Sequence, residues 1–209
     1  MKPRTSAPSL LSRRKAILAF TTSLGALLAA RFTFAEGTFV YGQDLDGHDI
    51  TMLAAPGTKY IAAIFVATDC PISNRYLPSL ARLSQQFAPR GIRFWLVYPN
   101  PDDTLAAVRA HQKQYPAAAA VPELIAPAPR FLAQAHVHVT PEAAIFHGDA
   151  ISQPVLWHGR IDDRYLTFGT QRPAANRHDL ADALSAALAG RQPAPPAAPP
   201  VGCAIIPRA

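Results

Sequence analysis

Two cysteines, Cys70 and Cys203, are the only thiols of the 209-residue chain and the side chains best suited to chemistry. Cys70 stands in residues 68–73 (TDCPIS), directly after an apolar run. Cys203 lies near the C-terminus, behind a segment made mainly of proline and alanine. A thiol at the start of a helix can be activated as a nucleophile, and a second thiol on a tether can reach it. The pair therefore indicates redox chemistry.

The position of Cys70 favours its thiolate form, which is the nucleophilic one. A helix N-terminus supplies free N–H groups and partial positive charge, and both lower the pKa of a nearby thiol. Pro71 suits the first turn of such a helix. Ser73 can donate a hydrogen bond to a thiolate but cannot form a disulfide. Asp69 opposes these effects as a neighbouring negative charge, and an inert, packed thiol is the alternative interpretation of Cys70.

The C-terminal tail gives Cys203 a long reach. Residues 192–200 are mostly Pro and Ala, which is typical of a semi-rigid, extended tether. From Gly190 to Cys203 such a tether spans about 40 Å at ~3.1 Å per residue. A domain of this size has a radius of gyration of ~15 Å. Cys203 can therefore reach Cys70, either as a switchable catalytic partner or as a fixed structural bridge. Two unrelated thiols are the third interpretation.

Alternating strands and helices are expected to position these residues. Apolar and β-rich runs predict strands at 59–66, 92–98, 123–125, 142–146 and 155–158. Helical spacing and caps predict helices from Ser73 or Asn74 to about Phe87, and over 102–115, 130–135 and 179–188. Turns are expected at 44–47, within an N-terminal β-hairpin, and at Gly148-Asp149, between the last two strands.

This order of elements predicts an α/β fold with a mixed central β-sheet flanked by helices. An N-terminal β-hairpin and an extended C-terminal tail complete it. Three parts are expected along the chain: an export signal over 1–35, one domain over 36–190, and a Pro/Ala-rich tether with the cysteine-containing tail over 191–209.

Residues 1–35 have the features of an export signal. Arg13 and Arg14 precede an apolar stretch at 16–30, and residues 33–35 (TFA) offer a cleavage site. The segment 12–18 (SRRKAIL) resembles a twin-arginine signal, with an ordinary secretory signal or an uncleaved anchor as alternatives. The stretch is short for a membrane span, which needs ~20 apolar residues. We expect a periplasmic or otherwise exported protein that meets the membrane only through this segment.

The charge of the chain gives no indication of an anionic partner. The net charge is +6, but six of the 20 basic residues and none of the 14 acidic residues lie in 1–35. The remainder is formally neutral and has no basic stripe with interleaved aromatic residues, so nucleic-acid binding is not expected. No glycine-rich phosphate loop, serine triad or zinc-ligand spacing is present, and no cofactor is predicted.

The chain resembles the thioredoxin-like superfamily over about residues 38–190. The resemblance rests on the apolar strand before Cys70, on Pro78 inside the following helix, and on residues 139–146 (VTPEAAIF), which look like a cis-proline loop entering a strand. The hairpin and the single cysteine point toward the redoxin branch (alkyl hydroperoxide reductase/thiol-specific antioxidant). Three segments, 69–76 (DCPISNRY), 159–165 (GRIDDRY) and 202–205 (GCAI), are similar to a bacterial group of exported redoxin-domain proteins.

The resemblance implies roles for individual residues. Cys70 would be the attacking thiol, and Thr140-Pro141 would form the loop that faces it. Ser73 stands where a dithiol motif carries its second cysteine, so self-contained dithiol exchange at Cys70 is excluded. Peroxiredoxins place Thr or Ser three residues before the attacking cysteine. Ala67 occupies that position here, which argues against efficient peroxide reduction.

Three other side chains are candidates for the site. His136 and His138 precede the Thr-Pro loop, and together with Cys70 they have the chemistry to bind copper, as in thioredoxin-like copper chaperones. Solvent-facing loop histidines are the simpler interpretation, and no metal site is predicted. Arg160 either stabilises the thiolate, braces the loop below the site, or belongs to an ion-pair cluster with neighbouring aspartates.

The sequence therefore predicts an exported thiol oxidoreductase that acts by thiol–disulfide exchange or by peroxiredoxin-like reduction. Cys70 would attack a protein disulfide or a peroxide, and Cys203 would resolve the product. Four residues would support them: Ser73, Thr140, Pro141 and Arg160. The alternative is a non-catalytic copper-binding or partner-docking module in which Cys70 and Cys203 form a fixed bridge.

Overall fold

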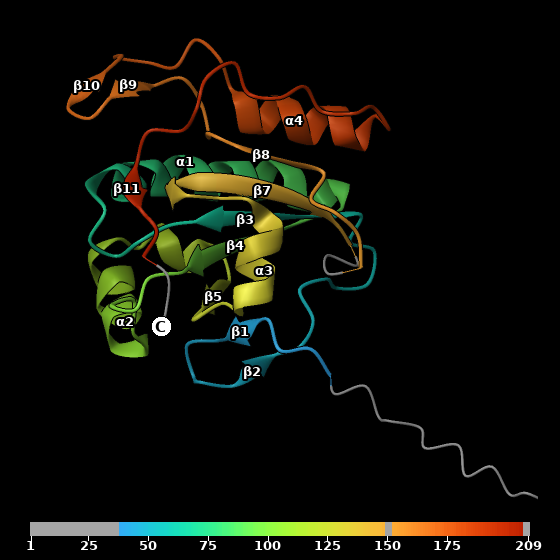
Figure 1. Cartoon of the computed structure of the whole chain (residues 1–209), viewed down its shortest axis with the longest axis vertical. Coiled ribbons are helices and arrows are strands. Elements are labelled where there is room, and N and C mark those ends of the chain that lie inside the picture. Colours follow the sequence, from blue (N-terminus) through green and yellow to red (C-terminus); the bar gives the residue numbers. More distant parts are fainter. Residues whose placement is uncertain (1–37, 149–151, 207–209) are drawn as a thin grey trace, which may run out of the picture. The chain divides into compact units, whose positions relative to one another are not determined.

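The computed structural model describes residues 38–148 and 152–206, which form a mixed β-sheet with helices on both faces (Figure 1). The strands of the sheet are β1 (Gly42–Gln43), β2 (Asp49–Ile50), β3 (Tyr60–Phe65), β4 (Ile92–Tyr98), β5 (Glu123–Ile125), β7 (Glu142–His147) and β8 (Trp157–Gly159). Their spatial order is β2-β1-β5-β4-β3-β7-β8. β3, β4 and β5 run parallel, whereas β1, β2, β7 and β8 each run antiparallel to their neighbours.

Helices cover both faces of the central strands. They are α1 (Pro71–Phe87), α2 (Leu105–Gln114), α3 (Pro129–Ala135) and α4 (Asp179–Leu188), with 3-10 turns η1 (Ala88–Arg90) and η2 (Ala118–Ala120). Figure 1 shows α1 and α4 on one side of the sheet and α3 on the other. Ile64 of β3 accordingly belongs to one apolar cluster with α1 and α4, and Phe65 to a second with Phe131 of α3. Burial on both faces explains why the sequences of β3 and β4 are nearly continuous apolar runs.

Two short strand pairs lie outside this sheet. β6 (Val139–Thr140) pairs with β11 (Cys203–Ala204), and β9 (Tyr165–Thr167) pairs with β10 (Thr170–Gln171). None of these four strands is predicted by the sequence, because two or three residues are too few to give a period-2 pattern.

The topology is that of a thioredoxin-like fold, which confirms the predicted fold class. Parallel strands β3 and β4 are connected through α1, and the Thr140-Pro141 peptide bond, which is cis, precedes the antiparallel strand β7. Most predicted bounds agree with the observed ones to within two residues. Exceptions are α1, which is capped by Cys70 rather than by Ser73 or Asn74, and α2, which begins at Leu105 rather than at 102. Thr104 is the residue that caps it, since its side chain accepts a hydrogen bond from the N–H of Ala107 over 3.2 Å.

Parts of the expected organisation fall outside the described residues. The export signal at 1–35 lies wholly outside them, as does Asp149 of the predicted turn. Within 38–148 and 152–206, no helix has the length and apolar character that a membrane crossing requires. The limits of the domain and of the signal remain predictions.

Candidate active site

Cys70 lies between β3 and α1 and is the residue that caps the N-terminus of α1. Its side chain is fully buried, with a relative exposure of 0%. Its Sγ donates a hydrogen bond to the backbone carbonyl of Thr140 over 3.1 Å. Pro71 begins α1 and Pro78 lies inside it. The thiol therefore stands at the positive end of a 17-residue helix, against the loop that contains the cis-proline.

The C-terminal tail forms a strand on the edge of that loop. β11 runs antiparallel to β6, with Cys203 opposite Thr140 and Ala204 opposite Val139. This register brings the Sγ atoms of Cys203 and Cys70 to 2.7 Å, although 133 residues separate the two cysteines in the chain. Both are free thiols, Cys70 buried and Cys203 half-buried. The structure thus brings together the two residues that the sequence predicts to pair.

Gly202 allows the tail to approach this closely. A Cβ atom added at Gly202 would lie 2.2 Å from the carbonyl oxygen of Thr140 and 2.7 Å from its carbonyl carbon. Both neighbours are backbone atoms of β6 and cannot rotate away as a side chain would. Any residue larger than glycine would therefore push β11 off β6 and separate the two thiols.

The two thiols differ in acidity. Burial raises the pKa of the Cys70 thiol, but hydrogen bonding from Cys203 and Ser73 outweighs it, so that this pKa lies below its ordinary value. Ser73 is itself buried, and its hydroxyl lies near enough to hydrogen-bond a Cys70 thiolate, although it has no hydrogen-bond partner among the described residues while Cys70 is a thiol. A thiolate at Cys70 would satisfy this hydroxyl. Burial, the hydrogen bond with Cys70, and the charges of Cys70 and Asp69 raise the pKa of Cys203 to about 12.

A buried carboxylate orders the turn that leads to Cys70. Asp103 accepts hydrogen bonds from the N–H and the hydroxyl of Thr68 over 2.9 and 2.8 Å. It also accepts one from the N–H of Asn100 over 3.2 Å. The side-chain oxygen of Asn100 in turn accepts the N–H of Ile206, at the end of the tail, over 2.9 Å. One polar network therefore connects the Cys70 turn to the segment that carries Cys203.

The tether before Cys203 is bound to the domain rather than free in solvent. The indole N–H of Trp157 in β8 donates to the carbonyl of Ala194 over 2.8 Å. Pro196 packs against Gly159, where an added Cβ would come within 2.6 Å of the proline ring. The Pro/Ala composition predicts that this segment is extended, but it does not predict that the segment docks along β8.

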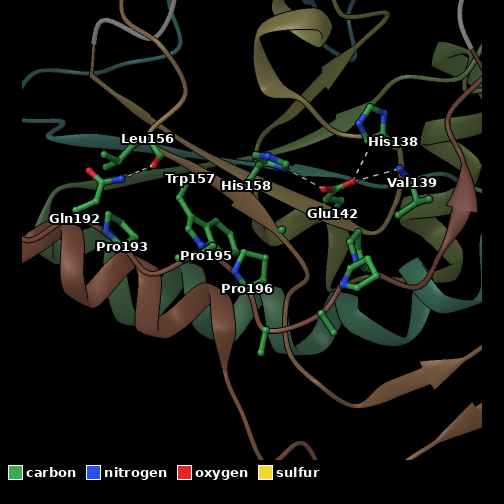
Figure 2. A pocket seen from close by; sticks show the side chains of 15 residues that line it. His138, Val139, Glu142, Leu156, Trp157, His158, Gln192, Pro193, Pro195 and Pro196 are labelled. Atoms are coloured by element: carbon green, nitrogen blue, oxygen red, sulfur yellow. Dashed lines mark hydrogen bonds and ion pairs between the residues drawn. The ribbon is translucent and has the colours of Figure 1, made fainter.

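A cavity of about 820 Å³ lies beneath the tether (Figure 2). Prolines of the tether, Trp157, and the side chains of His138, Glu142 and His158 line it. The buried Glu142 carboxylate accepts the N–H groups of His138 and Val139, over 2.9 and 3.4 Å, and lies 3.4 Å from Nδ1 of His158. Glu142 thereby holds the start of β6, the strand on which the tail docks.

The remaining predicted candidates lie apart from the thiol pair. Arg160 is mostly buried, and its Nε donates to the carboxylate of Asp179 at the start of α4 over 2.8 Å. Of the three interpretations of Arg160, this geometry agrees with an ion pair, although the partner is Asp179 and not one of the neighbouring aspartates. The ring of His136 lies beside that of His158, with centroids 6.0 Å apart. In the part of the chain that the structure describes, no group of three or more His, Cys, Asp or Glu side chains is arranged to hold a metal ion.

Several site residues escape prediction from the sequence. Gly202 carries a usable signal, since a glycine directly before a tethered cysteine is suited to close backbone approach. Glu142 also carries one, because an acid next to the Thr-Pro pair lies in an otherwise apolar strand. Asp103 and Asn100 give no such signal, since polar residues in a loop after a strand are common and their partners lie far along the chain.

The comparisons with known proteins concern the fold. No protein-family model matches the chain. No curated protein matches it either. A hypothetical protein from Sinorhizobium meliloti 1021 is a structural match with a TM-score of 0.61 and 23% identity, covering 82% of this chain and 91% of that one. An uncharacterized conserved protein from Geobacillus kaustophilus gives a TM-score of 0.60 and 22% identity, with 82% and 90% coverage.

A more distant solved structure is a secreted disulfide oxidoreductase from Mycobacterium tuberculosis, described as homologous to DsbE of Escherichia coli. The two sequences are 17% identical, and the match covers 73% of this chain and 96% of the Mycobacterium chain, with a TM-score of 0.45. The first two matches, at 23% and 22% identity, show a shared fold alone, and the chemistry of the present chain has to be argued from its own thiol pair.

Proposed function

We propose that this protein is an exported thiol–disulfide oxidoreductase of redoxin type, with Cys70 as the attacking thiol and Cys203 as the resolving thiol. The observation that carries the proposal is the 2.7 Å separation of two free thiols that lie 133 residues apart in the chain. Two further properties support it. Cys70 has the lower pKa, and Cys203 reaches it on a segment that pairs through backbone hydrogen bonds.

The proposed reaction transfers two electrons between thiols and a disulfide. The Cys70 thiolate attacks one sulfur of a substrate disulfide, forms a mixed disulfide, and releases the other substrate sulfur as a thiolate. Cys203, once deprotonated, attacks Cys70 Sγ and releases the second substrate thiolate. The substrate gains two electrons, and the protein is left with a Cys70–Cys203 disulfide. The reverse sequence of the same steps oxidises a dithiol.

Access to Cys70 requires the tail to move. Cys70 has no exposed surface, and β11 covers the edge of β6 beside it. A protein disulfide can therefore reach Cys70 only after β11 leaves β6. This end of the tail is held by the β11–β6 pairing, by hydrogen bonds of the Ile205 and Ile206 N–H groups, and by partly buried side chains that pack against the apolar clusters, but none of its contacts pairs it with a strand of the central sheet.

A disulfide is favoured over a peroxide as the substrate. Ala67 provides no hydroxyl at the position where peroxiredoxins carry one. The neighbouring hydroxyl, that of Thr68, donates to Asp103 over 2.8 Å and is occupied there. If hydrogen peroxide oxidised Cys70 as fast as a model protein disulfide does, this preference would be wrong.

A fixed structural bridge is the competing function for the same two residues. On the entropic model, closing so long a loop would stabilise the fold by ~4–5 kcal/mol. A redox titration, with the bond state measured by mass spectrometry, separates the two functions. We expect the Cys70–Cys203 bond to form and break between about −120 and −270 mV, the range of catalytic dithiols. A bond that resists reduction below about −300 mV would identify a structural bridge.

The location and partners follow from the leader and the site. We infer export by the twin-arginine route and a partner that is a protein thiol or disulfide. Fusing residues 1–35 to a reporter that is active only outside the cytoplasm tests the export, with Arg13 and Arg14 both changed to Lys as the variant expected to abolish it. Export that survives this change would favour the general secretory route.

A further inference from the structure

The cavity beneath the tether has apolar walls and a small polar side. Its volume of about 820 Å³ falls in the range of small-molecule sites, which is ~300–1,000 Å³. Trp157 and the tether prolines supply apolar walls, and the polar side contains Glu142 and His158. Figure 2 shows these two side chains on the domain, with Pro195 and Pro196 across from them on the tether. A few polar groups that converge in an apolar cavity are typical of a site for a small organic ligand.

The Glu142 carboxylate is a buried charge without a permanent cation beside it. Its side chain is only 2% exposed. Oε2 accepts the N–H groups of His138 and Val139, whereas the side-chain neighbour of Oε1 is Nδ1 of His158, at 3.4 Å. That distance is longer than a good N–H···O hydrogen bond, and a histidine is charged only when protonated. No lysine or arginine stands among the described residues that line the cavity. Oε1 therefore keeps the capacity to accept hydrogen bonds from a cation.

Two neighbouring acceptor atoms define the charged group of the ligand. When the His158 imidazole carries its proton on Nε2, Nδ1 and Glu142 Oε1 are both acceptors, 3.4 Å apart. An ammonium group has three donors and can bond to both atoms, and its hydrogen bond to a carboxylate is stronger than a neutral one. A metal ion does not fit, because within residues 38–148 and 152–206 no three His, Cys, Asp or Glu side chains are arranged to hold one.

We propose that this cavity binds a small organic ammonium ion whose apolar body fills the space beneath the tether. The ammonium group pairs with Oε1 of Glu142, and the body packs between Trp157 and the prolines of residues 193–200. The pairing compensates a buried charge, which is costly when it stands alone. The packing removes apolar surface of the ligand from water. The site uses neither thiol, so it is independent of the proposed redox function.

A ligand at this site connects the domain to the tail. Its charged group contacts Glu142 on β7, while its body contacts the tether that leads to Cys203. Glu142 also holds the start of β6, the strand on which β11 docks. A ligand that binds only the docked arrangement stabilises that arrangement by mass action. At ~100 times its dissociation constant, it should reduce the population with a released tail by ~100-fold.

The binding of three indoles of similar size tests the site. Tryptamine is cationic at neutral pH, tryptophol is neutral and indole-3-acetate is anionic, and all three share one ring system. Isothermal titration of the protein should give tryptamine a dissociation constant at least ~10-fold lower than that of tryptophol, with indole-3-acetate the weakest. Equal affinities of the three compounds, or no saturable binding of tryptamine, would overturn the proposal.

Three variants assign the binding to this cavity. Glu142→Gln removes the charge but keeps an oxygen that can accept the backbone N–H groups, so it should abolish the preference for tryptamine over tryptophol. Asp49→Asn, at an exposed position of β2, is the matched control and should keep that preference. Ala198→Trp fills the cavity from the tether side and should weaken tryptamine binding by more than ~10-fold without changing the carboxylate. A preference that survives Glu142→Gln, or tight binding that survives Ala198→Trp, would contradict the assignment.

The connection between the ligand and the tail is measured at Cys70. Saturating tryptamine should slow the alkylation of Cys70 in the reduced protein by up to ~100-fold, because alkylation needs the tail to be released. Tryptophol at the same concentration should slow it less, and Glu142→Gln should remove the difference between the two compounds. Tryptamine binding that leaves the alkylation rate unchanged would show that the ligand does not hold the tether on the domain.

Discussion

The segments that carry the two cysteines are built in opposite ways. Cys70 is held by a buried strand, a helix start and a hydrogen-bond network around Asp103, and it has no exposed surface. Cys203 lies on a two-residue edge strand that pairs with β6 and packs partly buried side chains against the surface of the core. The first segment is part of the core of the domain, whereas the second lies on its surface and can leave without unpairing the central sheet. The difference agrees with the proposed roles, an attacking thiol held in place and a resolving thiol on a movable segment.

Replacing each cysteine in turn should give the largest effects and separate their roles. Cys70→Ser removes the attacking thiol and should lower the rate of substrate disulfide reduction by more than ~100-fold. Cys203→Ser should leave the first attack intact but stop its resolution, so that a mixed disulfide with the substrate accumulates. Mass spectrometry of acid-quenched reactions measures both.

Ala204→Ser is the matched control for these two variants, because it places a hydroxyl on the same strand at an exposed position. It should behave as the unmodified chain. Equal loss of the first attack in the Cys70 and Cys203 variants would contradict the division of roles.

Gly202→Ala should release β11, the movable segment that carries Cys203, from β6. The added methyl group would clash with the carbonyl of Thr140, only 2.2 Å from the ideal Cβ position. Losing a pairing worth ~1–3 kcal/mol should slow formation of the Cys70–Cys203 disulfide by roughly 5–150-fold. Alkylation of Cys70 in the reduced protein should become faster, because the tail no longer covers it.

Ala204→Gly is the control for Gly202→Ala, since it changes the same strand without adding an atom. Its disulfide should form at close to the normal rate. Unchanged alkylation of Cys70 in Gly202→Ala would mean that the tail does not restrict access to this thiol.

The pKa of Cys70 should depend on Ser73, which lies in the same fixed segment. Hydrogen bonding lowers the Cys70 pKa despite burial, so the thiolate persists to a lower pH than for an ordinary thiol and is lost as the pH falls through the lowered pKa. Ser73→Ala should shift the pH profile of Cys70 alkylation upward. Ser79→Ala, farther along α1, should leave the profile in place, and a shift common to both variants would assign it to the helix as a whole.

Trp157→Phe should have the smallest effect, because it loosens the movable segment without preventing its docking. It removes the hydrogen bond to Ala194, worth about 1 kcal/mol, and should slow disulfide formation by about fivefold. Trp95→Phe is the matched control, since this indole donates over 2.9 Å to Leu53, away from the tether. Equal slowing in both variants would indicate a general loss of stability.

The sequence predicts the fixed segment better than the movable one. The buried strands, α1 and the position of Cys70 follow from apolar runs, helical spacing and a proline at the helix start, all of which are local signals. The docking of β11 on β6 depends on a two-residue register between segments far apart in the chain. No local pattern specifies such a register, although Gly202 marks the place in retrospect.

The polar network around Asp103 was not predictable for the same reason. Its carboxylate joins Thr68 and Asn100, which stand in separate loops, and neither loop carries an unusual composition. The hairpin of β9 and β10 was missed because its strands are short and mostly exposed. The sequence leaves three interpretations of Arg160 open, and its ion-pair partner, Asp179 of α4, lies too far along the chain for a local pattern to identify.

The anchoring of the tether at Trp157 sets the concentration at which Cys203 competes for Cys70. From Ala194 to Cys203 the chain advances about nine residues, which span at most ~28 Å when extended. Because this segment is so short, the effective concentration of the Cys203 thiol near Cys70 lies in the mM range. In the proposed mechanism, a mixed disulfide on Cys70 is therefore resolved by Cys203 unless free thiols outside the molecule reach comparable concentrations, so the length of this segment determines how long a partner remains attached.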